Sequence, residues 1–225
     1  MTDNHKSGVA LIAGSIGGIL TMAIHPTSSG VLTPPQFEHL ARVSAIAHTL
    51  AMVSFLALFL GAMGLTRRLA ACERSAMPDR LALAALTVFG FAAVALLLAT
   101  AISGFIVPDI MRHMIRDAAA NSPQWHIAID AVFQFNQAFA RIYSVAASVA
   151  ILLWSVSVLR NGGLGRGIAI FGCVLAPTLI ALIAIGHLRL DVHGMAVVVL
   201  AHALWFVVVG AQLWKQRDQP IVSPA

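Results

Sequence analysis

Residues 81–107 read LALAALTVFGFAAVALLLATAISGFIV, an apolar run that contains no charged side chain. An α-helix rises about 1.5 Å per residue, so about 20 apolar residues cross the hydrocarbon core of a bilayer. Five further runs are long enough, or nearly so, to do the same: Gly8–His25, Ser44–Leu65, Ala138–Leu159, Gly167–Gly186 and Gly194–Trp214. None of the six alternates with the period of two typical of a membrane β-barrel. The sequence therefore predicts an all-α protein, a polytopic membrane helix bundle of six transmembrane helices in a single domain over residues 1–225.

The composition excludes an ordinary soluble domain. Hydrophobic residues make up 59% of the 225 residues and charged residues only 10%, whereas a soluble domain carries about 25% charged residues. The formal net charge is +5, but Lys and Arg stand at the ends of the apolar runs and form no basic face. We therefore expect the lipid bilayer as a partner and no nucleic acid. Cys72 and Cys173 indicate neither a disulfide framework nor a Cys-rich metal site.

The distribution of Lys and Arg predicts the orientation of the spans. One set of alternate loops and ends holds nine of these residues: Lys6, Arg67, Arg68, Arg74, Arg80, Arg160, Arg166, Lys215 and Arg217. The other set holds three, Arg112, Arg116 and Arg189, and the remaining two of the 14, Arg42 and Arg141, lie within helices. Because the more positive loops stay in the cytoplasm, both termini are predicted to be cytoplasmic. We expect a multi-pass protein of the cell membrane, and the composition favours a bacterial inner membrane.

The first apolar run has a second interpretation as a cleaved signal peptide. It follows a short polar start and contains Thr21-x-Ala23, which is similar to a cleavage site. The same run carries Gly14-xxx-Gly18, a pattern typical of helix packing in membranes. We favour a retained helix, and cleavage would leave five spans with the same orientation.

Two helices are predicted to extend beyond the outer membrane surface. Thr33-Pro34-Pro35-Gln36 has the pattern of a capping box, which starts a helix that runs to Leu65. Ser122-Pro123 starts another that runs to Arg160. Between spans three and four, Pro108–Ala120 has one apolar and one polar face, which predicts a short interfacial helix lying on the outer surface.

The predicted topology gathers histidines toward the outer side. Imidazole is a common ligand of haem and of transition metals, so the candidate cofactor-binding residues are His25, His48, His187, His193 and His202. Asp191 is a candidate for orienting a ligand histidine. Asp191 and His202 are 11 residues apart and share a helical face, whereas His193 and His202, nine apart, point to opposite faces.

A polar stripe follows the fourth long helix. Its members are separated by three, four or seven residues: Asp130, Gln134, Gln137, Arg141, Ser144, Ser148 and Ser155. Such spacing places them on one face, which we expect to line a cavity open to the outer side together with Asp191. Arg141 is expected to pair with Asp191 or Asp130, and Asn136 and Tyr143 form a second, smaller polar edge.

Four functions remain open from the residues alone. The first is an integral inner-membrane protein that binds haem or a metal in this cavity. The alternatives are a solute or proton-coupled transporter, a membrane-embedded metal-dependent enzyme acting on lipid, and a structural or assembly protein. A small hydrophobic or metal ligand and a homo-oligomer are the partners these functions imply. No H-E-x-x-H or C-x-x-C-H motif occurs in the sequence.

Overall fold

The computed structural model describes residues 3–26, 33–71, 80–116 and 123–215. Within these ranges all regular structure is helical: α1 (Asp3–Ile24), α2 (Pro34–Ala71), α3 (Arg80–Ala101), the π-helical turn η1 (Ile102–Ile106), α4 (Val107–Arg116), α5 (Pro123–Asn161), α6 (Arg166–Ala184) and α7 (Val192–Lys215). Six helical stretches are long and apolar enough to cross a membrane, with α3, η1 and α4 forming one of them. The predicted all-α bundle with six such helices is confirmed.

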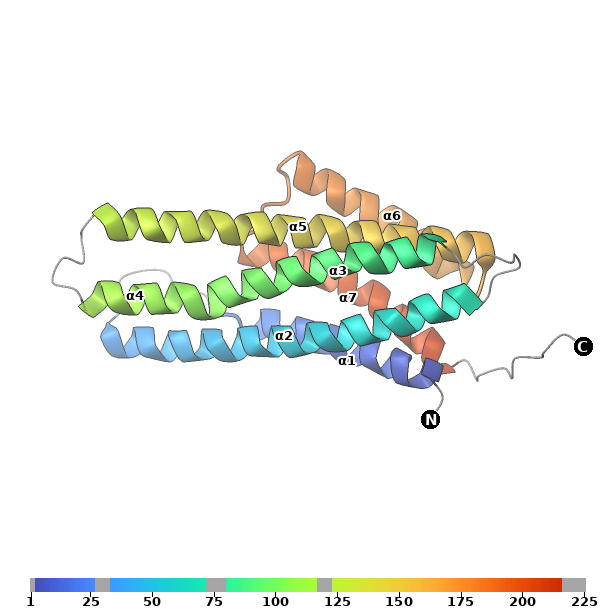
Figure 1. Ribbon diagram of the computed structural model, residues 1–225, viewed down its shortest axis with the longest axis horizontal. Coiled ribbons are helices and arrows are strands. Elements are labelled where there is room, and N and C mark those ends of the chain that lie inside the picture. Colours follow the sequence, from blue (N-terminus) through green and yellow to red (C-terminus); the bar gives the residue numbers. More distant parts are fainter. Residues whose placement is uncertain (1–2, 27–32, 72–79, 117–122, 216–225) are drawn as a thin grey trace, which may run out of the picture.

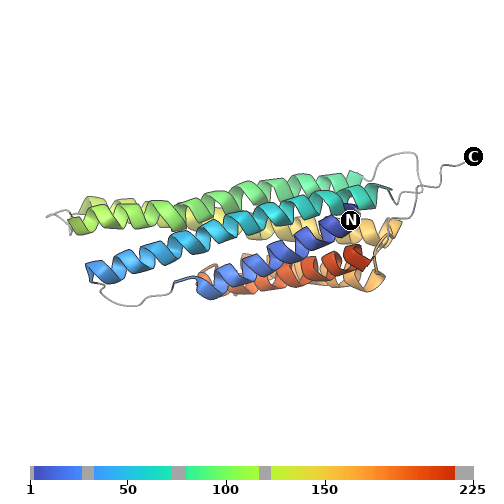
Figure 2. The same ribbon diagram turned by 90° about the horizontal axis from the view of Figure 1, so that it is seen from below.

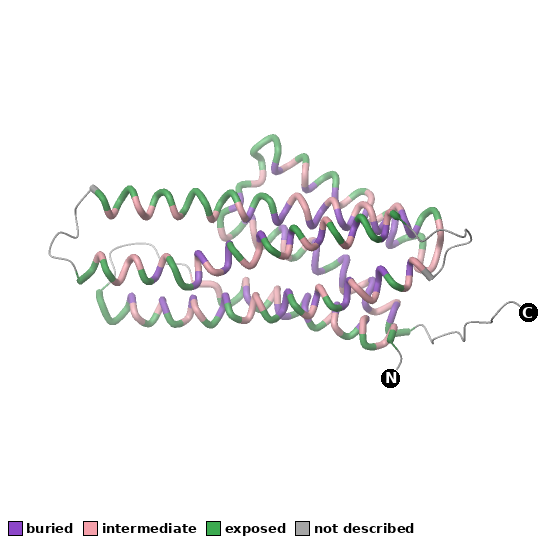
Figure 3. The backbone as a smooth tube through the Cα atoms, in the orientation of Figure 1, coloured by how far each residue is buried: buried purple, intermediate pink, exposed green. Residues whose placement is uncertain are grey.

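The helices run lengthwise side by side in an elongated bundle (Figures 1 and 2). α1 packs between α2 and α7, α3 packs against α2 and α5, and α6 packs on α5. We name the end that carries Asp3 and Lys215 the basal end and the opposite end the distal end. At the distal end α2, α4 and α5 continue past the ends of the other helices (Figure 1). Buried residues gather in the basal part, and the distal extension is mostly exposed (Figure 3).

The start of α2 follows from its local sequence. The side-chain oxygen Oε1 of Gln36 accepts a hydrogen bond from the backbone N–H of Thr33, at 3.0 Å. The N–H of Phe37 donates to the carbonyl oxygen of Thr33, at 2.9 Å. The first bond satisfies an N–H that the start of a helix leaves free, and the second is the first regular bond of α2. The long second helix is confirmed, and of the predicted capping box the bond from Thr33 N–H to Gln36 forms, while the Thr33 hydroxyl donates to the same Oε1.

The region predicted as an interfacial helix, Pro108–Ala120, differs from that prediction. Up to Arg116 it continues the helix of span three through η1, and residues 117–120 lie outside the described ranges. In η1 the N–H of Val107 donates to the carbonyl oxygen of Ile102, five residues back. This widened turn accommodates Pro108, whose ring would clash with the preceding turn of a regular α-helix. α4 is therefore a continuation of the third long helix and not a separate short helix.

Glycines bring α1 and α2 into close contact. A Cβ atom at Gly14 would lie 2.5 Å from the carbonyl oxygen of Ser54, and one at Gly61 would lie 2.8 Å from the backbone nitrogen of Leu11. Gly18, in contrast, would make only an ordinary contact of 3.6 Å. Close packing of this kind stabilises helix pairs in membranes, where helices gain little from hydrophobic burial. The first glycine of the Gly14-xxx-Gly18 pattern therefore makes the close contact, and Gly18 does not.

Candidate functional site

A cavity of about 640 Å³ lies among α1, α2, the α3–α4 helix, α5 and α7. Its polar lining residues are Ser15, Thr21, His25, Ser44, His48, Ser54, Thr100, Ser103, Asn136, Gln137, Tyr143, Asp191 and His202. The remaining lining residues are glycine, proline and apolar side chains, and no lysine or arginine of the described chain is among them. The cavity is thus largely apolar, with polar groups at a few positions, as is common for small-molecule sites.

His25 and His48 meet at this cavity although they lie on different elements. His25 follows the last residue of α1, and His48 lies on α2. Their ring centroids are 5.1 Å apart at an interplanar angle of 68°. The close approach of η1 to α2 positions His48, because a Cβ at Gly104 would lie 2.5 Å from the Cβ of His48. Burial lowers the pKa of His25, so its neutral form is favoured.

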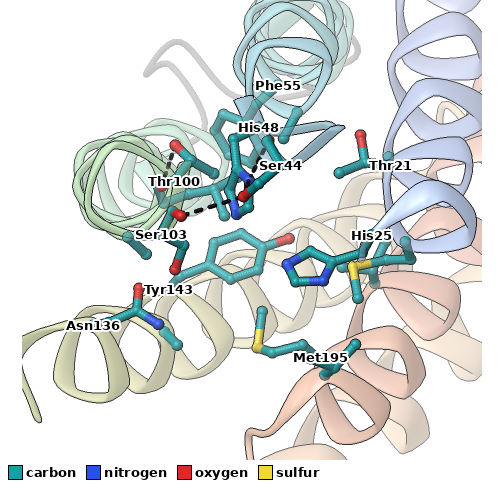
Figure 4. Close-up of a pocket in the computed structure, with 18 of the residues that line it drawn as sticks. Thr21, His25, Ser44, His48, Phe55, Thr100, Ser103, Asn136, Tyr143 and Met195 are labelled. Atoms are coloured by element: carbon teal, nitrogen blue, oxygen red, sulfur yellow. Dashed lines mark hydrogen bonds between the residues drawn. The ribbon is translucent and has the colours of Figure 1, made fainter. Parts of the chain in front are cut away.

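Nδ1 of each histidine is anchored to a backbone carbonyl. Nδ1 of His48 lies 2.7 Å from the carbonyl oxygen of Ser44, one helical turn earlier. Nδ1 of His25 lies 3.2 Å from the carbonyl oxygen of Pro26. The Ser44 hydroxyl also reaches the carbonyl oxygen of Ser103 in η1, at 3.4 Å (Figure 4). That carbonyl is available because Pro108, five residues on, has no N–H to donate.

Tyr143 and Asn136 extend into the cavity from α5. Figure 4 shows the Tyr143 ring among the side chains of His25, Asn136 and Met195. The phenol contacts the His202 ring edge to face, with centroids 6.1 Å apart. The sequence pattern places these two residues on a second, smaller polar edge, and neither is among the candidate site residues that the sequence predicts. Their seven-residue spacing was the signal that could have identified them.

His202 is 3% exposed and also lines the cavity. Its Nε2 lies 2.9 Å from the hydroxyl oxygen of Ser148 on α5. Asp191 lines the same cavity, and its Oδ1 accepts a hydrogen bond from the N–H of Gly194 at the start of α7. The two residues therefore face a common space, in line with their 11-residue separation.

The structure brings only part of the polar stripe to the cavity. Gln137 lines it and donates from Nε2 to the carbonyl oxygen of Leu190, at 3.2 Å. Ser144 is buried, and its hydroxyl donates to the carbonyl oxygen of Ala140. Ser144 does not line the cavity. Three exposed residues of the stripe are not lining residues either: Asp130, Gln134 and Arg141. Among the described residues Arg141 makes no ion pair with Asp130 or Asp191.

Two of the five candidate ligand histidines lie elsewhere. His187 is in the turn after α6 and His193 is in the first turn of α7; both are exposed and neither lines the cavity. Across the described ranges, no three His, Cys, Asp or Glu residues are grouped so that they could hold a metal ion. The structure thus brings together His25, His48 and His202 and leaves the other two apart.

Aromatic side chains close the basal side of the cavity. Phe55 and Phe206 line it, and each packs against Phe89 with ring centroids 5.1 Å and 5.5 Å apart. The ring of Trp154 packs against Phe89, with centroids 5.4 Å apart. Nε1 of Trp154 donates to the hydroxyl oxygen of Thr66, at 3.1 Å. Trp154 and Phe89 are almost completely buried. The core is therefore densely filled between the cavity and the basal end.

Comparison with protein-family models, with curated proteins and with solved structures finds no match for this chain. The function must therefore be inferred from the site itself.

Proposed function

We propose that this chain is a multi-pass membrane protein that binds a small, mainly apolar molecule in the distal cavity. The observation that carries the proposal is the cavity of about 640 Å³, whose apolar wall is interrupted by a few polar groups. That volume is far larger than a metal ion needs and lies within the range of about 300–1,000 Å³ typical of small-molecule sites. His25, His48 and Tyr143 supply the polar groups that would orient such a molecule.

The charge distribution supports an external position for this cavity. Seven described basic residues lie toward the basal end: Lys6, Arg67, Arg68, Arg80, Arg160, Arg166 and Lys215. Arg112, Arg116 and Arg189 lie toward the distal end, Arg42 lies in the distal part of α2, and Arg141 lies about halfway along α5. Because positively charged flanks stay in the cytoplasm, the proposal places the basal end inside and the cavity toward the outer side of a cell membrane. Arg74 and Arg217 belong to the same count but lie outside the described ranges.

A haem or transition-metal centre is less well supported by the same residues. The rings of His25 and His48 contact each other directly, which leaves no room for a haem plane between them. No third carboxylate, thiol or imidazole joins them in the described chain to complete a metal site. Two neutral imidazoles in an apolar cavity are better suited to orienting an organic molecule.

Transport and lipid chemistry have no specific observation in their favour. A route across the membrane would need a path through the basal half, where Phe55, Phe89 and Trp154 fill the core. Hydrolysis would need an accessible nucleophile with a base beside it. Ser148 lies beside His202, but its hydroxyl donates to the carbonyl oxygen of Ser144 and is fully buried outside the cavity lining. The Asp191 carboxylate is used at the start of α7. Binding accounts for the cavity without either addition.

The proposal is tested by filling the cavity. Ala140 is a buried lining residue, and Ala140→Phe would place a ring in the cavity. Ala84 is exposed on α3, so Ala84→Phe is a matched control outside the cavity. We expect solvent extraction and mass spectrometry to recover one molecule in near-stoichiometric amount from the wild type and from the Ala84 variant. The Ala140 variant should fold but retain little of it. Equal recovery from both variants, or no recovered molecule from any, contradicts the proposal.

A further inference from the structure

The tautomer of His48 follows from its hydrogen bond. A carbonyl oxygen can only accept, so the 2.7 Å contact with the carbonyl oxygen of Ser44 requires a proton on Nδ1. A neutral imidazole carries one ring proton, which leaves Nε2 as a bare acceptor. Among residues 3–26, 33–71, 80–116 and 123–215, no donor reaches that Nε2. His48 is 5% exposed and lines the cavity, so this acceptor is available only to something inside it.

His25 has the same arrangement. Its Nδ1 lies 3.2 Å from the carbonyl oxygen of Pro26, which again requires the proton on Nδ1 and leaves Nε2 as an acceptor. No described residue donates to it. Anchoring one ring nitrogen to a carbonyl fixes both the tautomer and the ring orientation. The cavity therefore contains two neighbouring imidazoles, with centroids 5.1 Å apart, that both offer lone pairs.

Several other polar groups of the cavity either have their proton already used or offer an acceptor, while the hydroxyl groups of Tyr143 and Ser15 and the amide nitrogen of Asn136 can donate. The hydroxyl groups of Thr21 and Thr100 donate to carbonyl oxygens of their own helices, at 2.9 Å each. Asn136 Oδ1, an acceptor, is buried without a partner in the described chain. The single hydroxyl proton of Ser148 is directed to the carbonyl oxygen of Ser144, so Nε2 of His202 donates to Ser148. Nδ1 of His202 is then a further buried acceptor, without a partner among the described residues.

We propose that the molecule bound in this cavity is an amphiphile whose polar end is a hydrogen-bond donor, a hydroxyl or an amine, received by Nε2 of His25 and Nε2 of His48. This inference rests on the proposed function and names the ligand class. A donor satisfies the two lone pairs, whereas a carbonyl, ether or anionic head would place lone pairs against lone pairs. Leaving a buried acceptor unpaired is costly. The absence of lysine and arginine from the described lining also disfavours an anionic head.

The experiment uses pairs of probes that differ in the donor. Decylubiquinol carries two hydroxyl groups, and decylubiquinone has carbonyl oxygens in their place. Dodecanol and dodecyl methyl ether form the aliphatic pair. Binding to the detergent-purified wild-type protein is measured by calorimetry under argon, with the Ala140→Phe variant as a blank for partition into micelles. We expect the donor member of at least one pair to bind about tenfold more tightly than its partner. The pair that does so shows whether the head is aromatic or aliphatic.

Variants of the two histidines test whether they cause this preference. His48→Phe and His25→Phe keep a ring of similar size and remove the acceptor, and either folded variant should reduce the tenfold preference to within about twofold. His193→Phe, outside the cavity, should leave it unchanged. Equal binding of both members of both pairs to the wild type overturns the donor assignment, while binding blocked by Ala140→Phe leaves the proposed function intact. Stoichiometric binding of Cu⁺ or Zn²⁺ that His25→Phe abolishes, with no donor preference, also overturns it.

Discussion

Nε2 of His202 on α7 lies 2.9 Å from the hydroxyl oxygen of Ser148 on α5. α5 and α7 are joined near the centre of the bundle by this buried contact between polar side chains. Nδ1 of the same ring has no partner in the described chain, so Ser148 supplies the one hydrogen bond of a buried imidazole.

Ser148→Ala is expected to lower the free energy of unfolding by about 1–3 kcal/mol, because it leaves both ring nitrogens of His202 buried and unpaired. The matched control is Ser144→Ala, whose hydroxyl donates to a carbonyl oxygen of its own helix. The control should lose distinctly less. Denaturant titration in mixed micelles, combined with His202→Ala in a double-mutant cycle, measures the coupling. Equal losses for the two serines would show that the contact with His202 contributes no stability.

Gly14→Ala is expected to destabilise the protein by about 1–3 kcal/mol through overpacking. The added methyl group would meet backbone atoms of Ser54 and Leu58 on α2, which cannot move aside like a flexible side chain. Gly90 on α3 has nothing within 4 Å of such a methyl group. Gly90→Ala should therefore be neutral or should stabilise the helix by about 0.5–1 kcal/mol. Thermal unfolding of both variants in one detergent checks the contrast, and a similar melting temperature for both would refute it.

The lowered pKa of His25 predicts a loss of stability at acid pH. Since the folded-state pKa lies below the ordinary value of 6.5, the unfolded chain binds the proton more strongly in the interval between the two values. The contribution of His25 is complete above pH 6.5 and is lost as the pH falls through its folded-state pKa. We expect a lower melting temperature at about pH 5 than at about pH 7.5.

His25→Asn should reduce this difference. His48, Tyr143, Asp191 and His202 line the same cavity and remain titratable in the variant. The change from wild type to variant therefore reports the contribution of His25 together with its effect on the ring of His48, which it contacts. An identical pH profile for the two proteins would show that His25 does not cause the acid sensitivity.

Glu38 and Arg112 form an ion pair between α2 and α4, with Nε of Arg112 3.1 Å from Oε1 of Glu38. Both side chains are partly exposed to solvent, which screens their attraction. We expect Glu38→Gln to cost less than about 1 kcal/mol at low salt and still less at high salt. The variant that exchanges the two charges, Glu38→Arg with Arg112→Glu, should regain the free energy of unfolding that Glu38→Gln loses. If the loss of stability does not change with salt, packing of the Glu38 side chain, and not its charge, causes the loss.

Labelling of introduced cysteines tests the orientation. After Cys72 and Cys173 are replaced by serine, a cysteine at Val31 or Asn121 should react with an impermeant maleimide added outside intact cells. A cysteine at Ser75 should react only after the membrane is opened. All three positions lie outside the described residues, so the test rests on the sequence pattern alone. The reverse labelling pattern would invert the assignment of the distal end to the outer side.

The long helices could be predicted because hydropathy and capping are local properties. Thr33 and Gln36 are three residues apart, and their hydrogen bond forms as the sequence indicates. The separate interfacial helix predicted from Pro108 does not form, because a π-helical turn carries the third long helix past the proline to Arg116. A single proline does not reveal whether the preceding turn can widen.

The cavity could be predicted only in part, because burial depends on where a partner helix begins. The polar stripe of α5 faces α7 at Ser148 and the turn before α7 at Gln137. α7 begins at Val192, so nothing in the described chain covers the stripe at Gln134 or Asp130. Periodicity carries no information on the length of the helix opposite, and it also places on this face Arg141, which is exposed. The meeting of His25 with His48 likewise depends on tertiary packing.

The unequal lengths of the helices determine whether the cavity faces lipid or water. α1 ends at Ile24 and α7 begins at Val192, while α2 and α5 continue distally past that level. In a bilayer that covers the apolar spans, this step lies near the lipid headgroups. If the ligand of the proposed function enters at this step, it comes from the leaflet as well as from water, and the leaflet concentrates apolar molecules. Occupancy would then depend on the mole fraction of the ligand among the lipids, and apparent affinities would change with the amount of membrane in the assay.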